Sequence, residues 1–188
     1  MDRRELLKMI AVITGSAVVG GEFFSSGCKN KESKVAGLSF SQNDIAFLDE
    51  IGETILPKTN TPGAKDAEVG KFMTTVVNDC YKESDQQVFV DGIKKLDEAC
   101  TKMFGHGFMK ADVTHRKELL TSLDKEAKEY AKNKKKDEPN HYFTMMKQLT
   151  LLGFFTSKPG LQQCFDYLPV PGKYDGGAAY KENDKMYV

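Results

Sequence analysis

Apolar side chains recur at helical spacing through most of this 188-residue chain, and this periodicity constrains its fold more than any other feature. The clearest example follows Asp66, where one helical face carries Val69, Phe72, Met73, Val76, Val77 and Cys80. No segment alternates between apolar and polar residues for long enough to predict a β-strand. The predicted class is therefore all-α, a single small domain of about five helices.

Capping residues and helix breakers predict where these helices begin and end. The first helix runs from Ser41 to Pro57, and the third ends at the glycines of Gly105-His106-Gly107. The predicted helix starts are Ser41 with Asp44, Asp66, Ser84 with Gln87, Thr114, and Pro139 as the first residue of the last helix. The predicted inward faces extend to helix-end residues, namely Cys80, Met103, Tyr130 and Leu152.

The first 28 residues have the layout of a twin-arginine export leader. Arg3 and Arg4 precede a short, weakly apolar run from Met9 to Gly21, and small residues then lead to Cys28. A core or interfacial helix that follows two arginines is the alternative, although the segment lacks amphipathic periodicity. The leader predicts a periplasmic protein with three parts: an export signal over 1–28, a polar tether over 29–40 and a folded domain over 41–188.

Cys28 raises the further expectation of a lipid anchor. A small residue precedes it and a polar stretch follows it, as at a lipoprotein cleavage site. Ser25, three positions upstream, departs from the leucine-like residue that is usual there. Two outcomes therefore remain open, lipidation of Cys28 or its removal by ordinary signal peptidase.

The other three cysteines are far apart and form no metal-binding or redox pair. Cys80 and Cys100 fall at apolar positions of predicted helices, and we expect them to be buried small hydrophobes. Cys164 lies outside the predicted helices and is a candidate for pairing with another chain.

Charge argues against nucleic acid as a partner. The chain carries 27 basic and 27 acidic residues, so its formal net charge is zero. The basic run Lys132–Lys136 is followed at once by Asp137 and Glu138, which is typical of a solvated loop.

The sequence offers no recognised catalytic or cofactor-binding motif, such as a dinucleotide-binding glycine loop, a haem-attachment pair or a nucleophile elbow. His115 and Glu118 are spaced to face one metal ion, and an enzyme that uses such a site is one alternative. The other two histidines are expected on the surface, His106 in a loop and His141 in a first helical turn. Adjacent carboxylates such as Asp49-Glu50 diverge around a helix and therefore suit solubility.

The segment from about residue 158 differs in composition from the predicted helices. It contains prolines, glycines and scattered aromatic residues but no helical pattern. Disordered segments are normally poor in aromatic residues. We therefore expect this irregular tail to pack on its own domain or on a neighbouring chain.

Three stretches together resemble the gluconate 2-dehydrogenase subunit 3 family: Leu48–Pro57, Thr61–Val69 and Leu149–Gly160. Tyr167, the segment Pro169–Gly172 and Tyr174 follow in the same order as in that family. Each stretch alone is short, and the resemblance depends on their order and spacing from about Leu48 to Tyr174.

The resemblance implies a small, non-catalytic accessory subunit with no catalytic, cofactor-binding or metal-binding residue of its own. The implied partner is an FAD-binding dehydrogenase of the glucose-methanol-choline type that oxidises sugars or sugar acids. A cytochrome c with haem c is implied as a third subunit, and the twin-arginine translocase as the export machinery. The candidate partner interface comprises Pro62, Gly63, Phe154, Phe155, Tyr167, Pro171, Gly172 and Tyr174.

Each of these interface residues also has an alternative role within its own domain. It can form a turn, belong to the core, or pack the tail against the helices. A free-standing exported helical lipoprotein that binds a ligand or acts as a scaffold is the alternative function.

Overall fold

The computed structural model of the chain describes residues 38–170 and, after them, 172, 177, 179, 181, 182, 184 and 185. Ser39–Val188 form one compact unit. Several predicted residues lie outside the described part of the chain: Arg3, Arg4, Cys28, Pro171 and Tyr174.

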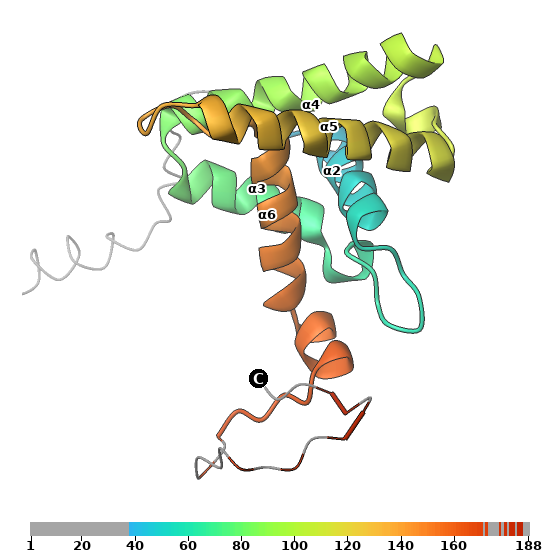
Figure 1. Cartoon of the computed structure of the whole chain (residues 1–188), viewed down its shortest axis with the longest axis vertical. Coiled ribbons are helices and arrows are strands. Elements are labelled where there is room, and N and C mark those ends of the chain that lie inside the picture. The colour runs from blue at the N-terminus through green and yellow to red at the C-terminus, as the bar shows by residue number, and fades with distance from the viewer. Residues whose placement is uncertain are drawn as a thin grey trace, which may run out of the picture. The chain divides into compact units, whose positions relative to one another are not determined.

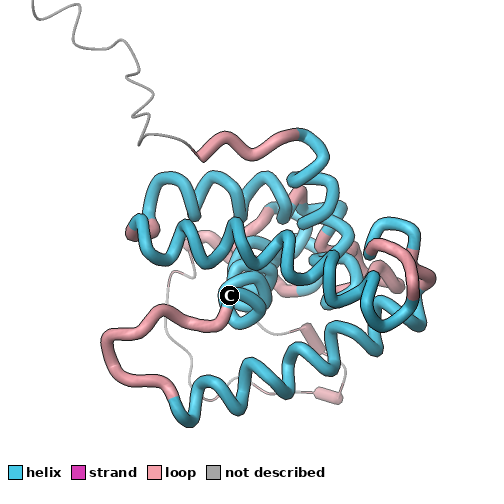
Figure 2. The backbone as a smooth tube through the Cα atoms, turned by 90° about the horizontal axis from the view of Figure 1, so that it is seen from above, coloured by secondary structure: helices cyan, strands magenta, loops and turns pink. Residues whose placement is uncertain are grey.

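Five α-helices dominate the described residues: α2 (Gln42–Ile55), α3 (Val69–Cys80), α4 (Glu83–Phe104), α5 (Val113–Asn133) and α6 (Tyr142–Phe155) (Figure 1). Two short 3₁₀ turns, Lys65–Ala67 and Phe108–Lys110, precede α3 and α5. The part of the chain that the structure describes contains no β-strand (Figure 2), so the all-α prediction is confirmed. None of the described helices is long and apolar enough to cross a membrane.

Helix α6 lies at the centre of this arrangement. It contacts each of the other four helices and runs crosswise to α4 and α5 (Figure 1). Its buried residues form one broad side of the helix rather than a narrow stripe: Tyr142, Phe143, Met145, Met146, Leu149, Thr150, Gly153 and Phe154. Leu151, Leu152 and Phe155 on the opposite side are also apolar although they are exposed, so the helix has little amphipathic character.

The N-terminal cap of α2 is confirmed. The amide of Asp44 donates to Ser41 Oγ at 3.2 Å, and the amide of Ser41 donates to Asp44 Oδ2 at 2.8 Å, which completes a capping box. The C-terminal end of α4 is also confirmed, because Gly105 adopts the left-handed conformation with φ of 78°.

The predicted starts of α3 and α4 are wrong. Asp66 lies in the 3₁₀ turn before α3, which begins only at Val69 after Glu68 in the left-handed conformation with φ of 51°. Helix α4 begins at Glu83, so Ser84 is already inside the helix and does not cap it.

The predicted starts of α5 and α6 are also wrong. Asp112, rather than Thr114, caps α5 by accepting from the amide of His115 at 2.7 Å. Helix α6 begins at Tyr142, and His141 rather than Pro139 stands at its boundary.

Four residues predicted to face inward are exposed instead: Cys80, Met103, Tyr130 and Leu152. Each lies in the last turn of its helix, where neighbouring helices no longer cover the apolar face. The predicted irregular tail also begins later than residue 158, because a π-helical turn, Gly160–Cys164, follows α6.

Candidate partner-binding surface

The loop between α2 and α3 is held by two acidic side chains. Glu53 accepts from the amide of Lys58 at 2.8 Å and from the amide of Lys65 at 3.0 Å, while Asp66 accepts from the amide of Gly63 at 3.2 Å. Pro62 and Gly63 are buried within this loop. Their burial favours the internal-turn alternative over direct contact with a partner.

Asp49 fixes the start of α3 against α2. Its Oδ1 accepts from the amide of Gly70 at 2.7 Å. A Cβ atom at position 70 would lie 2.4 Å from the carbonyl oxygen of Ile45, so this approach of the two helices requires glycine. Burial raises the pKa of Asp49 above its ordinary value, and the hydrogen bond from Gly70 opposes this rise.

Glu50 and Arg116 form the centre of a second polar network. Arg116 Nη1 donates to Glu50 Oε2 at 2.6 Å, and the side-chain exposures are 16% for the arginine and 19% for the glutamate. Lys65 pairs with the other oxygen of Glu50. The bond to Lys65, followed by that to Arg116, holds the pKa of Glu50 below its ordinary value although burial opposes this effect.

Arg116 also organises the turn before α5. It donates from Nε to the carbonyl of Phe108 at 3.1 Å and from Nη2 to the carbonyl of Met109 at 3.0 Å. Its guanidinium lies 5.1 Å from the centroid of the Phe108 ring, within cation–π range. One arginine therefore ties α2, the 3₁₀ turn and α5 together.

The prediction that Asp49 and Glu50 serve solubility is wrong. The two carboxylates do diverge around α2, but Asp49 binds the start of α3 and Glu50 binds Lys65 and Arg116. Sequence reasoning missed both roles, and their position inside the first family-like stretch, Leu48–Pro57, was the available signal.

The candidate partner-binding surface lies at the end of α6. We call it the α6-end surface and define it by six exposed apolar residues: Leu151, Leu152, Phe155, Tyr167, Leu168 and Val170. The Phe155 ring lies 5.6 Å from the Phe165 ring, which joins the helix end to the following segment. Large exposed apolar patches mark interaction sites, and these six residues are the candidates for such a patch.

The structure divides the predicted interface residues between this surface and the interior. Phe155 and Tyr167 are 40% and 47% exposed, whereas Phe154 is 4% exposed and belongs to the core. Gly172 is exposed and has φ of 69°, so it forms a left-handed bend beyond the surface.

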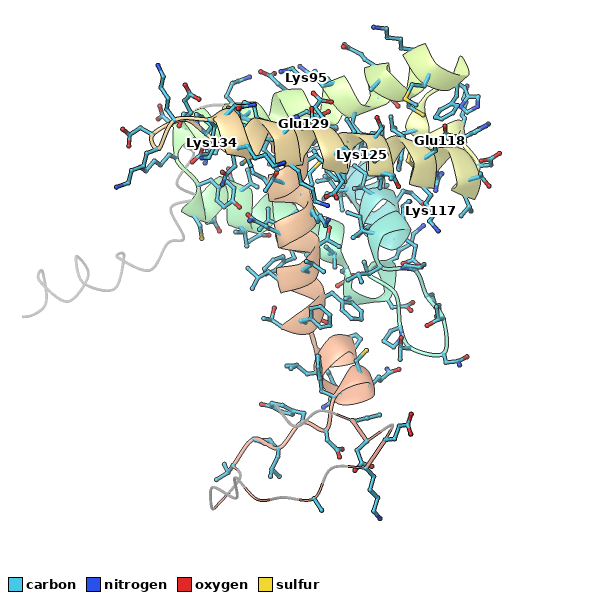
Figure 3. All side chains as sticks on the ribbon, viewed as in Figure 1. Lys95, Lys117, Glu118, Lys125, Glu129 and Lys134 are labelled. Carbon is cyan, nitrogen blue, oxygen red and sulfur yellow. The ribbon has the colours of Figure 1, made fainter. Side chains whose placement is uncertain are left out.

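His115 and Glu118 do not come together in a site. His115 stacks on Phe104 with ring centroids 4.2 Å apart and points Nδ1 towards Asp112, 3.5 Å from its Oδ2. Glu118 lines a shallow groove with Lys117 and Lys125 on α5 (Figure 3). Among the residues that the structure describes, no group of three or more His, Cys, Asp or Glu side chains is arranged to hold a metal ion.

The other two histidines differ from their predicted surface positions. The Nδ1 atom of His106 is buried and has no hydrogen-bond partner. The His141 side chain is only 10% exposed, so its prediction as a surface residue is wrong.

The three described cysteines are free thiols. Cys100 is buried as predicted, and burial raises the pKa of its thiol. Cys164 is half-buried in the π-helical turn and packs against the core.

Comparison with protein families gives one match. The family model described as gluconate 2-dehydrogenase subunit 3 matches residues 42–172, which is well over half of the chain. No curated protein gives a significant match. No solved structure does so either. The match extends from the first residue of α2, through the Asp49 and Glu50 networks and the α6-end surface, to Gly172. The chain belongs to the gluconate 2-dehydrogenase subunit 3 family, which is named for an accessory subunit of a dehydrogenase.

Proposed function

We propose that this protein is the non-catalytic small subunit of a periplasmic, FAD-dependent dehydrogenase that oxidises sugars or sugar acids. Its partner is a flavoprotein of the glucose-methanol-choline type, which carries the FAD and performs the chemistry. The small subunit supports the export, maturation and stability of that flavoprotein. A cytochrome c with haem c is the proposed electron acceptor in the complex.

The α6-end surface is the observation that carries this proposal. Six apolar side chains are exposed, three at the end of α6 and three in the segment after it, and they offer apolar area for a contact with another subunit. Aromatic anchors such as Phe155 and Tyr167 dominate the energetics of protein–protein contacts. Phe155 lies on α6, the helix that contacts all the others, and this gives its part of the contact a rigid base.

The predicted leader supports the export part of the proposal. Arg3 and Arg4 are typical of a pathway that carries folded proteins, and a flavoprotein must fold around its FAD before it crosses. A small subunit that binds this partner in the cytoplasm would carry it across the membrane, and the leader of the small subunit would serve both proteins. Lipidation at Cys28 would then hold the complex at a membrane.

Purification of the tagged chain from its native envelope tests the proposal. We expect flavin absorbance and sugar-dependent dye reduction to elute with the tagged chain, and both to be absent from the chain produced alone. A chain that purifies alone from the envelope, stable and without flavin, would instead favour the free-standing lipoprotein.

A further inference from the structure

The start of α6 is capped by a histidine, which is the most unusual feature of the described helices. His141 Nδ1 accepts from the amide of Phe143 at 3.3 Å, in the position normally taken by a Ser, Thr, Asp or Asn oxygen. Unlike those oxygens, an imidazole nitrogen can accept only while it carries no proton.

The surroundings of His141 keep it largely away from water. The Tyr142 ring lies 4.3 Å and the Tyr130 ring 5.7 Å from the imidazole, centroid to centroid. The Tyr130 hydroxyl donates to the carbonyl of Pro139 at 3.2 Å and so fixes the loop that leads to the cap. Burial also raises the pKa of Tyr142 to about 12, in keeping with a desolvated helix start.

The first turn of α6 packs against both α4 and α5. On α4, a Cβ atom at Gly92 would lie 2.4 Å from the Cβ of Tyr142, so the two helices meet at van der Waals distance. On α5, Tyr130 and Glu126 face the imidazole. Fraying of this turn would therefore disturb the contacts of α6 with both neighbours.

The charged groups that face His141 act in opposite directions. Glu126 on α5 lies 3.6 Å from Nε2 and favours the protonated imidazole, but its side chain is 65% exposed and solvent screens it. Lys95 on α4 disfavours the protonated form, as does the positive end of the α6 dipole. Burial is the largest influence, and the pKa of His141 is lowered from its ordinary value.

We propose that His141 is a proton-sensitive cap of the central helix. The neutral imidazole holds the first turn of α6, whereas the protonated imidazole loses the bond from Phe143 and leaves a positive charge at the helix N-terminus. Acid therefore loosens the start of α6 before it unfolds the domain. This inference is independent of the proposed function and of any partner.

The direction of the pH effect follows from the lowered pKa. The unfolded chain binds a proton at a pH of about 6.5, whereas the folded chain does so only at lower pH. The cap therefore contributes its full stability above about pH 6.5, and this contribution is lost as the pH falls through the folded-state pKa.

Nuclear magnetic resonance on the full chain tests the proposal. We expect the His141 imidazole to titrate with a midpoint below about 6.5, and the protection of the Phe143 amide against hydrogen exchange to fall roughly fivefold across that midpoint. A midpoint at or above 6.5, or equal Phe143 protection on both sides of it, would overturn the proposal.

Two variants provide matched controls. His141→Asn retains an oxygen cap that does not titrate, so Phe143 protection should no longer change across this pH range. The same pH-dependent loss in this variant would contradict the proposal. Glu126→Gln keeps the cap but removes the group that favours the proton, so the His141 midpoint should fall further, and a raised midpoint would contradict the geometry described above.

Discussion

Arg116 Nη1 and Glu50 Oε2 lie 2.6 Å apart, although 66 residues separate them in the chain. This contact connects α5 to α2 and, through the other bonds of Arg116, to the turn at Phe108. The same glutamate binds Lys65 at the end of the α2–α3 loop. A single charged cluster therefore holds together α2, the end of the α2–α3 loop and the start of α5.

The substitution Arg116→Met tests how much this cluster contributes to the free energy of unfolding. The change leaves Glu50 largely buried with only Lys65 as a partner and removes two donors from the turn carbonyls. Breaking a mostly buried ion pair on one side costs about 3 kcal/mol of unfolding free energy. Urea denaturation measures the loss, with Lys128→Met as control, because that lysine is 69% exposed and its pair contributes about 0.5 kcal/mol or less. Equal losses for the two variants would contradict the bracing role.

Glu50 gives this cluster a defined pH dependence. Its folded-state pKa is lowered from the ordinary value of 4.5, so it contributes stability above that value and loses it as the pH falls through the folded-state pKa. The difference in unfolding free energy between the wild type and Glu50→Gln should therefore be large at neutral pH and become small in acid. Urea titrations at several pH values measure this difference, and a constant difference down to pH 3 would refute the role of the ionised carboxylate.

The α6-end surface predicts a separation of binding from stability. Leu152→Ala and Phe155→Ala remove side chains that are 51% and 40% exposed, so the melting temperature of the chain alone should fall far less than it does when a core residue such as Phe154 is truncated. Their combination should weaken retention of the flavoprotein at least about tenfold, as the loss of contact anchors does. Val113→Ala is the control, since Val113 is 78% exposed at the start of α5 and lies outside this surface. Equal retention of the flavoprotein by the wild type, the double variant and Val113→Ala would show that the partner binds to another surface.

The leader predicts where the partner's activity is found. Replacing both Arg3 and Arg4 by lysine should leave the flavoprotein folded and active in the cytoplasm, because the paired arginines are the address of the pathway. Cell fractionation with a dye-reduction assay measures the distribution. Normal export of the partner with this variant would show that the flavoprotein does not depend on this leader.

The five helices could be predicted because their apolar faces repeat with the period of a helix. Their exact starts could not, since two of them depend on unusual residues. Glu68 before α3 is in the left-handed conformation without a side-chain cap, and His141 caps α6 with a ring nitrogen. Neither residue belongs to the usual capping set.

The polar networks were harder to predict than the helices. The partner of Glu50 lies in a helix far along the chain, and nothing local to Glu50 distinguishes a braced carboxylate from a solvated one. The family-like stretches did point to the right places. They contain Asp49, Glu50, Glu53, Gly63 and Asp66, which together hold α2, the loop and the start of α3.

The central claim, that this chain supports another subunit's flavin chemistry, is tested most directly by producing the flavoprotein with and without it. The measurement is the flavin content and sugar-dependent dye reduction per mole of purified flavoprotein. We predict that flavin-loaded, active flavoprotein accumulates only when the small subunit is co-produced, and that it is found in a stable complex with this chain. Equal flavin content and activity in its absence would contradict the account.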